Sequence, residues 1–180
     1  MVYVLLADGC EEIEALAPVD ILRRGGCEVK TVGITGKTVR GSHGIKIDAD
    51  VTPEEVKDDI ELLVFPGGLP GADYLDASPY TDKFIEMAQK NGGRIAAICA
   101  SPYILGKRGL LENKKATCYP SEKFISQLKG ANYTGEKVVT DKNITTSSDM
   151  GAALLFGCEL LSLLKGEEVA SSVASSAIIK

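Results

Sequence analysis

Short apolar runs alternate along the chain with longer segments in which apolar residues recur at helical spacing. The first run, residues 2–7, is apolar at every position, which is typical of a strand covered on both faces. The runs predict strands at residues 2–7, 27–34, 60–65, 95–98, 116–119, 138–140 and 144–146. The periodic segments predict helices at residues 11–24, 52–55, 78–90, 103–108, 120–128, 150–165 and 167–175.

The alternation of strands with helices predicts an α/β fold, in which a mainly parallel sheet carries helices on both faces. Residues 35–50 are rich in Gly, Ser and Lys and predict a small hairpin or edge strands. We find no linker, repeat or low-complexity tract in the sequence, so residues 1–180 are expected to form a single domain.

The first predicted helix, residues 11–24, begins with acidic residues, which interact favourably with the helix dipole. Its spacing predicts an inward face formed by Ile13, Leu16, Ala17 and Ile21. Pro18 lies inside this segment and has no backbone N–H to donate, so we expect the helix to kink or divide there.

Composition and charge exclude several classes of function. The net charge is −5, and Lys and Arg are scattered without a basic stripe, which argues against a protein that binds nucleic-acid backbones. No apolar run approaches the roughly 18 residues of a membrane span, and the N-terminus enters a strand without a charged leader segment. We therefore expect a soluble, cytoplasmic protein.

The five cysteines are odd in number and widely spaced, without a C-x-x-C pair. They are Cys10, Cys27, Cys99, Cys118 and Cys158. The chain has one histidine, so the pattern argues against a Cys/His zinc site, and we expect no metal or cofactor. Free thiols suit a reducing compartment, where most of these cysteines would be inert core residues.

Cys99 differs from the other cysteines because it directly follows a predicted strand and precedes the small residues and Pro102 of a helix start. The helix dipole and free backbone N–H groups at such a turn favour a thiolate over a thiol. We interpret Cys99 as a nucleophilic or redox-active residue with a depressed pKa. The alternative is a buried structural cysteine at the end of a strand.

Ligands gather at the carboxyl ends of the strands in sheets of this type. Residues 8–14, 66–68 and 99–101 follow three of the predicted strands, so we expect them to meet at one edge of the sheet. The Gly67-Gly68 pair would let backbone N–H groups approach a substrate oxygen, as an oxyanion hole requires. Its alternative role is an ordinary turn with positive φ.

Glu14 lies beyond the other acids of its helix start, beside the apolar Ile13 and Ala15. A carboxyl in a partly apolar pocket has a raised pKa, and its protonated form could donate to a thiolate. A solvated acid at a helix N-terminus fits the same spacing.

Three further residues are weaker candidates. His43, in a Gly-Ser-His-Gly segment, is either a general base or a surface loop residue. Tyr119 follows another predicted strand and is a candidate lining residue of the same pocket. Cys118, beside it, is either a resolving thiol or an ordinary strand residue.

Three separated motifs resemble the ThiJ/PfpI superfamily, and within it the DJ-one branch, named for a parkinsonism-associated protein. The motifs are Gly9-Cys10-Glu11-Glu12-Ile13-Glu14 with residues 18–24, Phe65-Pro66-Gly67-Gly68, and residues 96–102 around Cys99. The resemblance continues through residues 166–170 and so covers nearly the whole chain.

The resemblance implies a flavodoxin-like three-layer sandwich related to class I glutamine amidotransferase domains, usually assembled as a homodimer. It implies Cys99 as the nucleophile and Glu14 as the carboxyl hydrogen-bonded to its sulfur. The backbone amides of Gly67, Gly68 and Ala100 match the oxyanion-type site of the family.

The activities implied are a cofactor-independent glyoxalase reaction and deglycation of amines and thiols modified by methylglyoxal or glyoxal. Oxidative-stress sensing and chaperone activity are also implied. We therefore expect a glyoxalase- or deglycase-type enzyme that acts on small dicarbonyls or glycated adducts. The alternative is a redox-sensing chaperone whose Cys99 oxidises to a sulfinate with little turnover.

The chain departs from the family pattern at three positions. Tyr119 stands where many relatives carry histidine, and a phenol with a pKa near 10 is a poor general base at neutral pH. Ala100 follows the nucleophile where the peptidase branch has histidine, which argues against proteolysis. His43 stands near a position where close relatives often have arginine.

Overall fold

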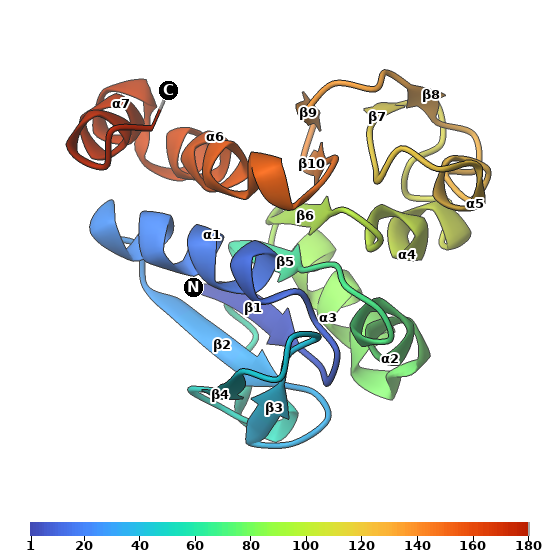
Figure 1. The fold of residues 1–180 in the computed structure, drawn as a ribbon, viewed down its shortest axis with the longest axis horizontal. Coiled ribbons are helices and arrows are strands. Elements are labelled where there is room, and N and C mark those ends of the chain that lie inside the picture. The colour runs from blue at the N-terminus through green and yellow to red at the C-terminus, as the bar shows by residue number, and fades with distance from the viewer. Residues whose placement is uncertain (180) are drawn as a thin grey trace.

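The computed structural model describes residues 1–179, in which six strands form the central sheet in the order β2-β1-β5-β6-β10-β9 (Figure 1). The parallel strands are β1 (Val2–Leu6), β2 (Val29–Gly33), β5 (Leu62–Phe65), β6 (Arg94–Ile98) and β10 (Ile144–Ser147). The edge strand β9 (Val138–Asp141) pairs antiparallel with β10. The predicted mainly parallel sheet is confirmed.

Helices cover both faces of this sheet because its central strands β1 and β5 are apolar and buried at every position. Val2, Val4 and Leu6 pack in one core against α1 (Glu12–Arg24), α6 (Ala153–Lys165) and α7 (Glu167–Ser176). Tyr3 and Leu5 face the other core, which lies beneath α2 (Gly71–Ala77), α3 (Pro79–Lys90), α4 (Pro102–Lys107) and α5 (Glu122–Ile125). The two layers of helices are visible on opposite sides of the strands in Figure 1, and they confirm the predicted three-layer α/β fold.

Shorter strands and turns lie outside the central sheet. Strands β3 (Thr38–Arg40) and β4 (Lys46–Asp48) form the predicted hairpin. A 3₁₀ turn, η1 (Pro53–Glu55), begins at the predicted Thr52 cap. Strands β7 (Lys115–Ala116) and β8 (Asn132–Tyr133) form a separate parallel pair, and a second 3₁₀ turn, η2 (Met150–Ala152), precedes α6. Within residues 1–179, no helix combines the length and apolar character that a membrane crossing requires.

The predicted inward face of α1 is only partly confirmed: Ile21 is buried and Ala17 is half-buried against the core, but two other residues face outward. Ile13 and Leu16 are 49% and 37% exposed, whereas Glu12 and Glu14 are buried. The buried acids share the inward side of the helix with the apolar residues Ala15, Pro18, Val19, Ile21 and Leu22. The spacing of apolar residues therefore predicted the later part of the face at Ile21 and misplaced its first turns, at Ile13 and Leu16.

The sequence predicted that helix α1 would kink or divide at Pro18, and it does not divide there. It continues from residue 12 to residue 24, and it packs so closely on α6 that a Cβ added at Gly157 would lie 3.2 Å from the Cα of Pro18. Pro18 therefore lies at a close contact between two helices.

Three other predicted elements also need correction. The predicted strand at 116–119 ends at Ala116, because the Tyr119 N–H donates to the Cys99 carbonyl (2.8 Å) instead of to a strand. The predicted helix at 120–128 is helical only over α5. The helix predicted at 150–165 begins as the 3₁₀ turn η2, and α2 was not predicted at all.

Candidate active site

The carboxyl ends of β1, β5 and β6 bring together the three segments that the sequence singled out. The chain leaves β1 to form β2 on one side, while β5 lies on the other side of β1, so the strand order reverses at this point. The Glu11 N–H donates to the Gly67 carbonyl (3.0 Å), and the Ser101 hydroxyl donates to the Pro66 carbonyl. These bonds join all three segments at one edge of the sheet, as predicted.

Cys99 occupies the tight turn from β6 to α4, with φ at +62°. A side chain other than glycine in this left-handed region costs about 1–2 kcal/mol, so the surrounding structure must hold it. Its N–H donates to the Ser147 carbonyl (2.9 Å), and its carbonyl accepts the N–H of Tyr119 (2.8 Å). The residue is only partly buried. The predicted turn is confirmed, and it presents a partly accessible thiol.

The Glu14 carboxyl lies beside this thiol although it is only 1% exposed. Its Oε2 accepts the Gly67 N–H (3.1 Å), and the carboxyl is hydrogen-bonded to Cys99. Burial raises the pKa of Glu14 to about 7, and the charges of Glu11 and Asp149 add to this rise while the two hydrogen bonds oppose it. The raised pKa that the sequence predicted follows mainly from burial.

The pKa of the Cys99 thiol is raised, not depressed as the sequence predicted. Burial and the neighbouring Glu14 carboxylate raise it, while hydrogen bonds from the backbone N–H groups of Ala100 and Gly68 act in the opposite direction. The prediction counted the amides at the helix start and left out the cost of placing a second negative charge beside Glu14.

The carboxyl and the thiol therefore titrate as a pair. The carboxyl holds its proton up to about pH 7. While that proton is on Glu14, the charge that opposes a thiolate is absent, and the acid can donate to the sulfur. The arrangement can store one proton beside a nucleophile and return it, which is the requirement for acid–base chemistry on a bound substrate.

His43 lies apart from Cys99 and pairs with Glu12. Its Nδ1 lies 2.9 Å from a Glu12 carboxylate oxygen, and its backbone N–H donates to the other oxygen (2.8 Å). Burial by itself would raise the pKa of Glu12, but these hydrogen bonds outweigh it and lower the pKa to about 2. The ion pair in turn raises the pKa of the exposed His43. His43 therefore fastens the hairpin loop to α1, a role that the sequence did not indicate.

Of the remaining candidate residues, Tyr119 contacts the Cys99 turn through its backbone, whereas Cys118 and Cys10 are buried. The Tyr119 backbone supports the Cys99 turn, while its ring is 45% exposed and packs edge-on against Phe124. Cys118 is buried, and burial raises the pKa of its thiol to about 12. Cys10 is buried as well, with a thiol pKa raised to about 11. Both thiols are closed off from solvent, whereas Cys99 is partly exposed, so neither is as accessible to a substrate as Cys99.

In the part of the chain that the structure describes, the donor atoms of Glu11, Glu12 and His43 lie within 4.8 Å of one another. These atoms already serve the protein itself. Glu11 caps α1 by accepting the Glu14 N–H (2.8 Å), and Glu12 accepts from His43. The group is therefore explained by helix capping and by the fastening of the loop.

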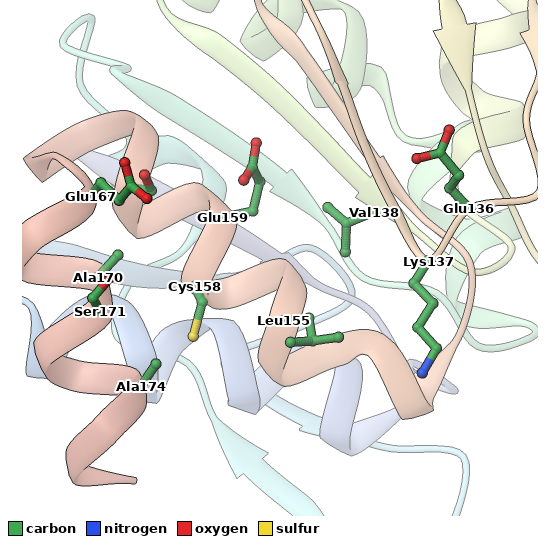
Figure 2. Close-up of a pocket in the computed structure, with 11 residues that line it drawn as sticks. Glu136, Lys137, Val138, Leu155, Cys158, Glu159, Glu167, Ala170, Ser171 and Ala174 are labelled. Atoms are coloured by element: carbon green, nitrogen blue, oxygen red, sulfur yellow. The ribbon is translucent and has the colours of Figure 1, made fainter. Parts of the chain in front are cut away.

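A cavity of about 760 Å³ lies away from Cys99, between β9, α6 and α7 (Figure 2). Leu155, Cys158 and Glu159 reach it from α6, and Ala170 and Ala174 reach it from α7. Glu159 accepts a hydrogen bond from Thr140 (2.7 Å), and none of the residues predicted to form the site lines this space. The chemical groups that converge are at Cys99.

Comparison with known proteins gives consistent matches over the chain. The model of the DJ-1/PfpI family matches residues 1–163. The chain is 35% identical over 179 residues to the protein dj-1beta of Drosophila melanogaster, covering 98% of this chain and 95% of that protein. It is 31% identical over 171 residues to a Caenorhabditis elegans protein named glutathione-independent glyoxalase DJR-1.2, covering 94% and 91%. It matches DJ-1 homolog B of Arabidopsis thaliana at 35% identity over 183 residues, covering 99% of this chain but only 41% of that relative's length.

Solved structures agree with these matches. The crystal structure of Drosophila melanogaster DJ-1beta has a TM-score of 0.92 at 35% identity, covering 99% of this chain and 97% of that one. The oxidised form of Toxoplasma gondii DJ-1 has a TM-score of 0.89 at 33% identity, covering 98% and 97%. Both likenesses extend over the sheet and the helices on its two faces.

Proposed function

The chain belongs to the DJ-1/PfpI family, and from this premise we propose that it is a cysteine-dependent, cofactor-independent glyoxalase-type enzyme. Its substrates would be methylglyoxal and glyoxal, and by extension their adducts with amines and thiols, in defence against carbonyl and oxidative stress. The observation that carries the proposal is the placement of the buried Glu14 carboxyl beside Cys99, where both side chains meet at Gly67. One similar protein is named a glutathione-independent glyoxalase, which supports the same reaction class.

In the proposed reaction, the Cys99 thiol adds to the aldehyde of methylglyoxal: its sulfur bonds to the aldehyde carbon, and its proton passes to the aldehyde oxygen to give a hemithioacetal. Glu14, as carboxylate, removes the hydrogen from that carbon to form an enediol, and it then delivers a proton to the adjacent carbon. The resulting thioester of lactate is cleaved by water, which releases lactate and restores the thiol. Overall, methylglyoxal and one water give lactate.

The environment of Glu14 suits it to both proton transfers. A catalytic group works best when its pKa lies near the operating pH, and the pKa of Glu14 is about 7. The backbone N–H groups of Gly68 and Ala100, which bind the sulfur, lie where they could also stabilise charge on the substrate oxygen. This arrangement supplies acid–base catalysis without the family histidine, whose place Tyr119 takes.

The test is lactate formation from methylglyoxal without glutathione. We expect the Glu14→Gln variant to lose about 10²–10⁴-fold in kcat, the usual contribution of a general acid–base group. Cys99→Ala should be inactive, while Cys118→Ala, which removes a buried thiol, should retain activity. A wild-type rate no higher than that of Cys99→Ala would refute the proposal.

A second candidate function, a redox-sensing chaperone, is favoured by the partial exposure of Cys99 and by the amides that surround its sulfur. Those amides could hold sulfinate oxygens after oxidation. A similar structure is of an oxidised DJ-1 from Toxoplasma gondii. Intact-mass measurement after mild peroxide tests this function: preferential addition of two oxygens at Cys99 supports it, and equal oxidation of all five cysteines contradicts it.

We also propose that the protein is a cytoplasmic homodimer. Ile13 and Leu16 on α1 are exposed, and so are Met150 in η2 and Leu154 in the first turn of α6. Helices α1 and α6 pack against each other (Figure 1), and exposed apolar side chains on adjoining helices are of the kind that subunit interfaces cover. Free thiols, Cys99 among them, suit a reducing compartment such as the cytoplasm.

A further inference from the structure

Ser101 is buried completely, two residues after Cys99 and outside the set of residues that the proposed reaction uses. Its hydroxyl donates to the Pro66 carbonyl (2.5 Å), which belongs to a different loop at the same edge of the sheet. Its backbone lies in the turn itself, since its N–H donates to the Ile98 carbonyl (3.1 Å) and its own carbonyl accepts the Ile104 N–H (2.9 Å). Ser101 therefore joins a rigid turn to the Gly67-Gly68 loop.

The Pro66 carbonyl and the Gly67 N–H are the two ends of one peptide unit. A peptide unit is planar, so fixing the direction of its C=O also fixes the direction of its N–H. The Gly67 N–H donates to Oε2 of Glu14 (3.1 Å). The hydroxyl of Ser101, this peptide and the Glu14 carboxyl therefore form one continuous chain of hydrogen bonds.

Space around this peptide is tight. A Cβ added at Gly67 would lie 2.5 Å from Glu14 Oε2 and 2.8 Å from the Cβ of Cys99. The backbone thus passes between the acid and the nucleophile, and a small rotation of the peptide would change the distance from its N–H to Oε2. A group that prevents this rotation would control the hydrogen bond to Glu14.

We propose that Ser101 is a positioning residue, which holds and polarises the Pro66–Gly67 peptide so that its N–H binds the carboxylate form of Glu14. Hydrogen bonds in series strengthen one another, so the bond at the carbonyl makes the N–H a better donor. This inference rests on the proposed acid–base role of Glu14, and it assigns to this chain the residue that adjusts the proton affinity of that acid.

The direction of the effect follows from the groups that face Glu14. Glu11 at the start of α1 and Asp149 before η2 raise its pKa by their charge, while Cys99 and the Gly67 N–H lower it by hydrogen bonding. Loss of the Ser101 hydroxyl weakens the Gly67 bond and leaves the other groups in place. The pKa of Glu14 should therefore rise in Ser101→Ala. Complete loss of a hydrogen bond of ordinary strength corresponds to about half a unit to one unit, so the weakened bond should give an upward shift of up to that size.

The experiment is a ¹³C NMR titration of protein labelled at the glutamate carboxyl carbon, without substrate, so it does not depend on turnover. The Glu14 signal is identified by its absence from Glu14→Gln. Wild type should titrate near pH 7. Ser101→Ala should titrate higher by the amount given above, and Ser101→Thr, which restores a hydroxyl, should move back toward wild type.

The matched control is Thr81→Val in α3. Thr81 is also buried, and its hydroxyl also donates to a backbone carbonyl, that of Leu75, so this variant loses the same kind of bond far from the acid. No shift in Ser101→Ala, or an equal shift in Thr81→Val, would overturn the inference. If Ser101→Thr does not fold, the comparison of Ser101→Ala with Thr81→Val still tests the role of Ser101. A shift in a protein that makes no lactate would support the inference while refuting the proposed glyoxalase.

Discussion

The pair of Glu12 and His43 allows a stability prediction whose magnitude can be worked from the structure. Glu12 is 4% exposed, and its carboxylate accepts hydrogen bonds from His43 and, more weakly, from the Ser42 hydroxyl (3.3 Å). Its pKa falls from 4.5 to about 2 in the folded protein, a difference equivalent to about 3 kcal/mol of folding free energy at neutral pH. Glu12→Gln keeps the size of the side chain and removes this charge-dependent contribution.

The way this stability difference changes with pH provides a sharper test than its size at a single pH. A carboxyl whose pKa is lower in the folded chain contributes its full stability above the unfolded pKa, and it loses that contribution as the pH falls toward the folded pKa. The stability difference between wild type and Glu12→Gln should be about 3 kcal/mol at pH 7. It should fall to about 1 kcal/mol near pH 3 as Glu12 becomes protonated.

Urea unfolding, followed by circular dichroism at several pH values, measures this difference directly. Glu86→Gln, the same substitution at an exposed position of α3, is the control and should change stability by less than about 0.5 kcal/mol at every pH. A difference between wild type and Glu12→Gln that stayed constant from pH 7 to pH 3 would contradict the reasoning. In that case the variant would act by packing alone.

Three other substitutions have defined outcomes. Gly67→Ala places a Cβ against Glu14 and Cys99, so lactate formation should fall by at least about 10²-fold while the far-ultraviolet circular dichroism stays native; an active variant would mean that the peptide can move aside. Phe156→Ala empties a fully buried site between α6 and the sheet, and urea unfolding should register a loss of about 3–5 kcal/mol. Ile13→Asp places a charge on the exposed apolar surface of α1; sedimentation should find monomers where wild type is dimeric, and an unchanged mass would remove this surface from the interface.

The sequence predicted the centre of the sheet well because β1, β5 and β6 each contain a continuous apolar run. It failed on the first turns of the inward face of α1, because a buried carboxylate such as Glu12 has no signature in a pattern of apolar residues. The segment after Ala116 was misjudged for a different reason. There the chain is held by a backbone hydrogen bond to Cys99, which is distant in sequence and cannot be read from local spacing.

In the candidate site, too, features with a local sequence pattern were predicted, and features that depend on long-range contacts were not. Gly67 and Cys99 were found because turns between strands and helices have a local signature of small residues. The direction of the thiol pKa was missed because it depends on the distance to one charged side chain, Glu14, and on how completely both groups are buried. His43 was detected as a candidate, but its partner Glu12 could be identified only from the folded hairpin.

The hydrogen bond from the Cys99 N–H to the Ser147 carbonyl also has a consequence for the order of events during synthesis. A chain grows from its N-terminus, so Glu14, Gly67 and Cys99 all leave the ribosome well before residue 147 does. Until β10 is added beside β6, the strained turn lacks one of its two backbone supports and can relax. The nascent chain would therefore lack this support of the Cys99 turn, and the thiol would acquire its complete surroundings only after residue 147 has been added.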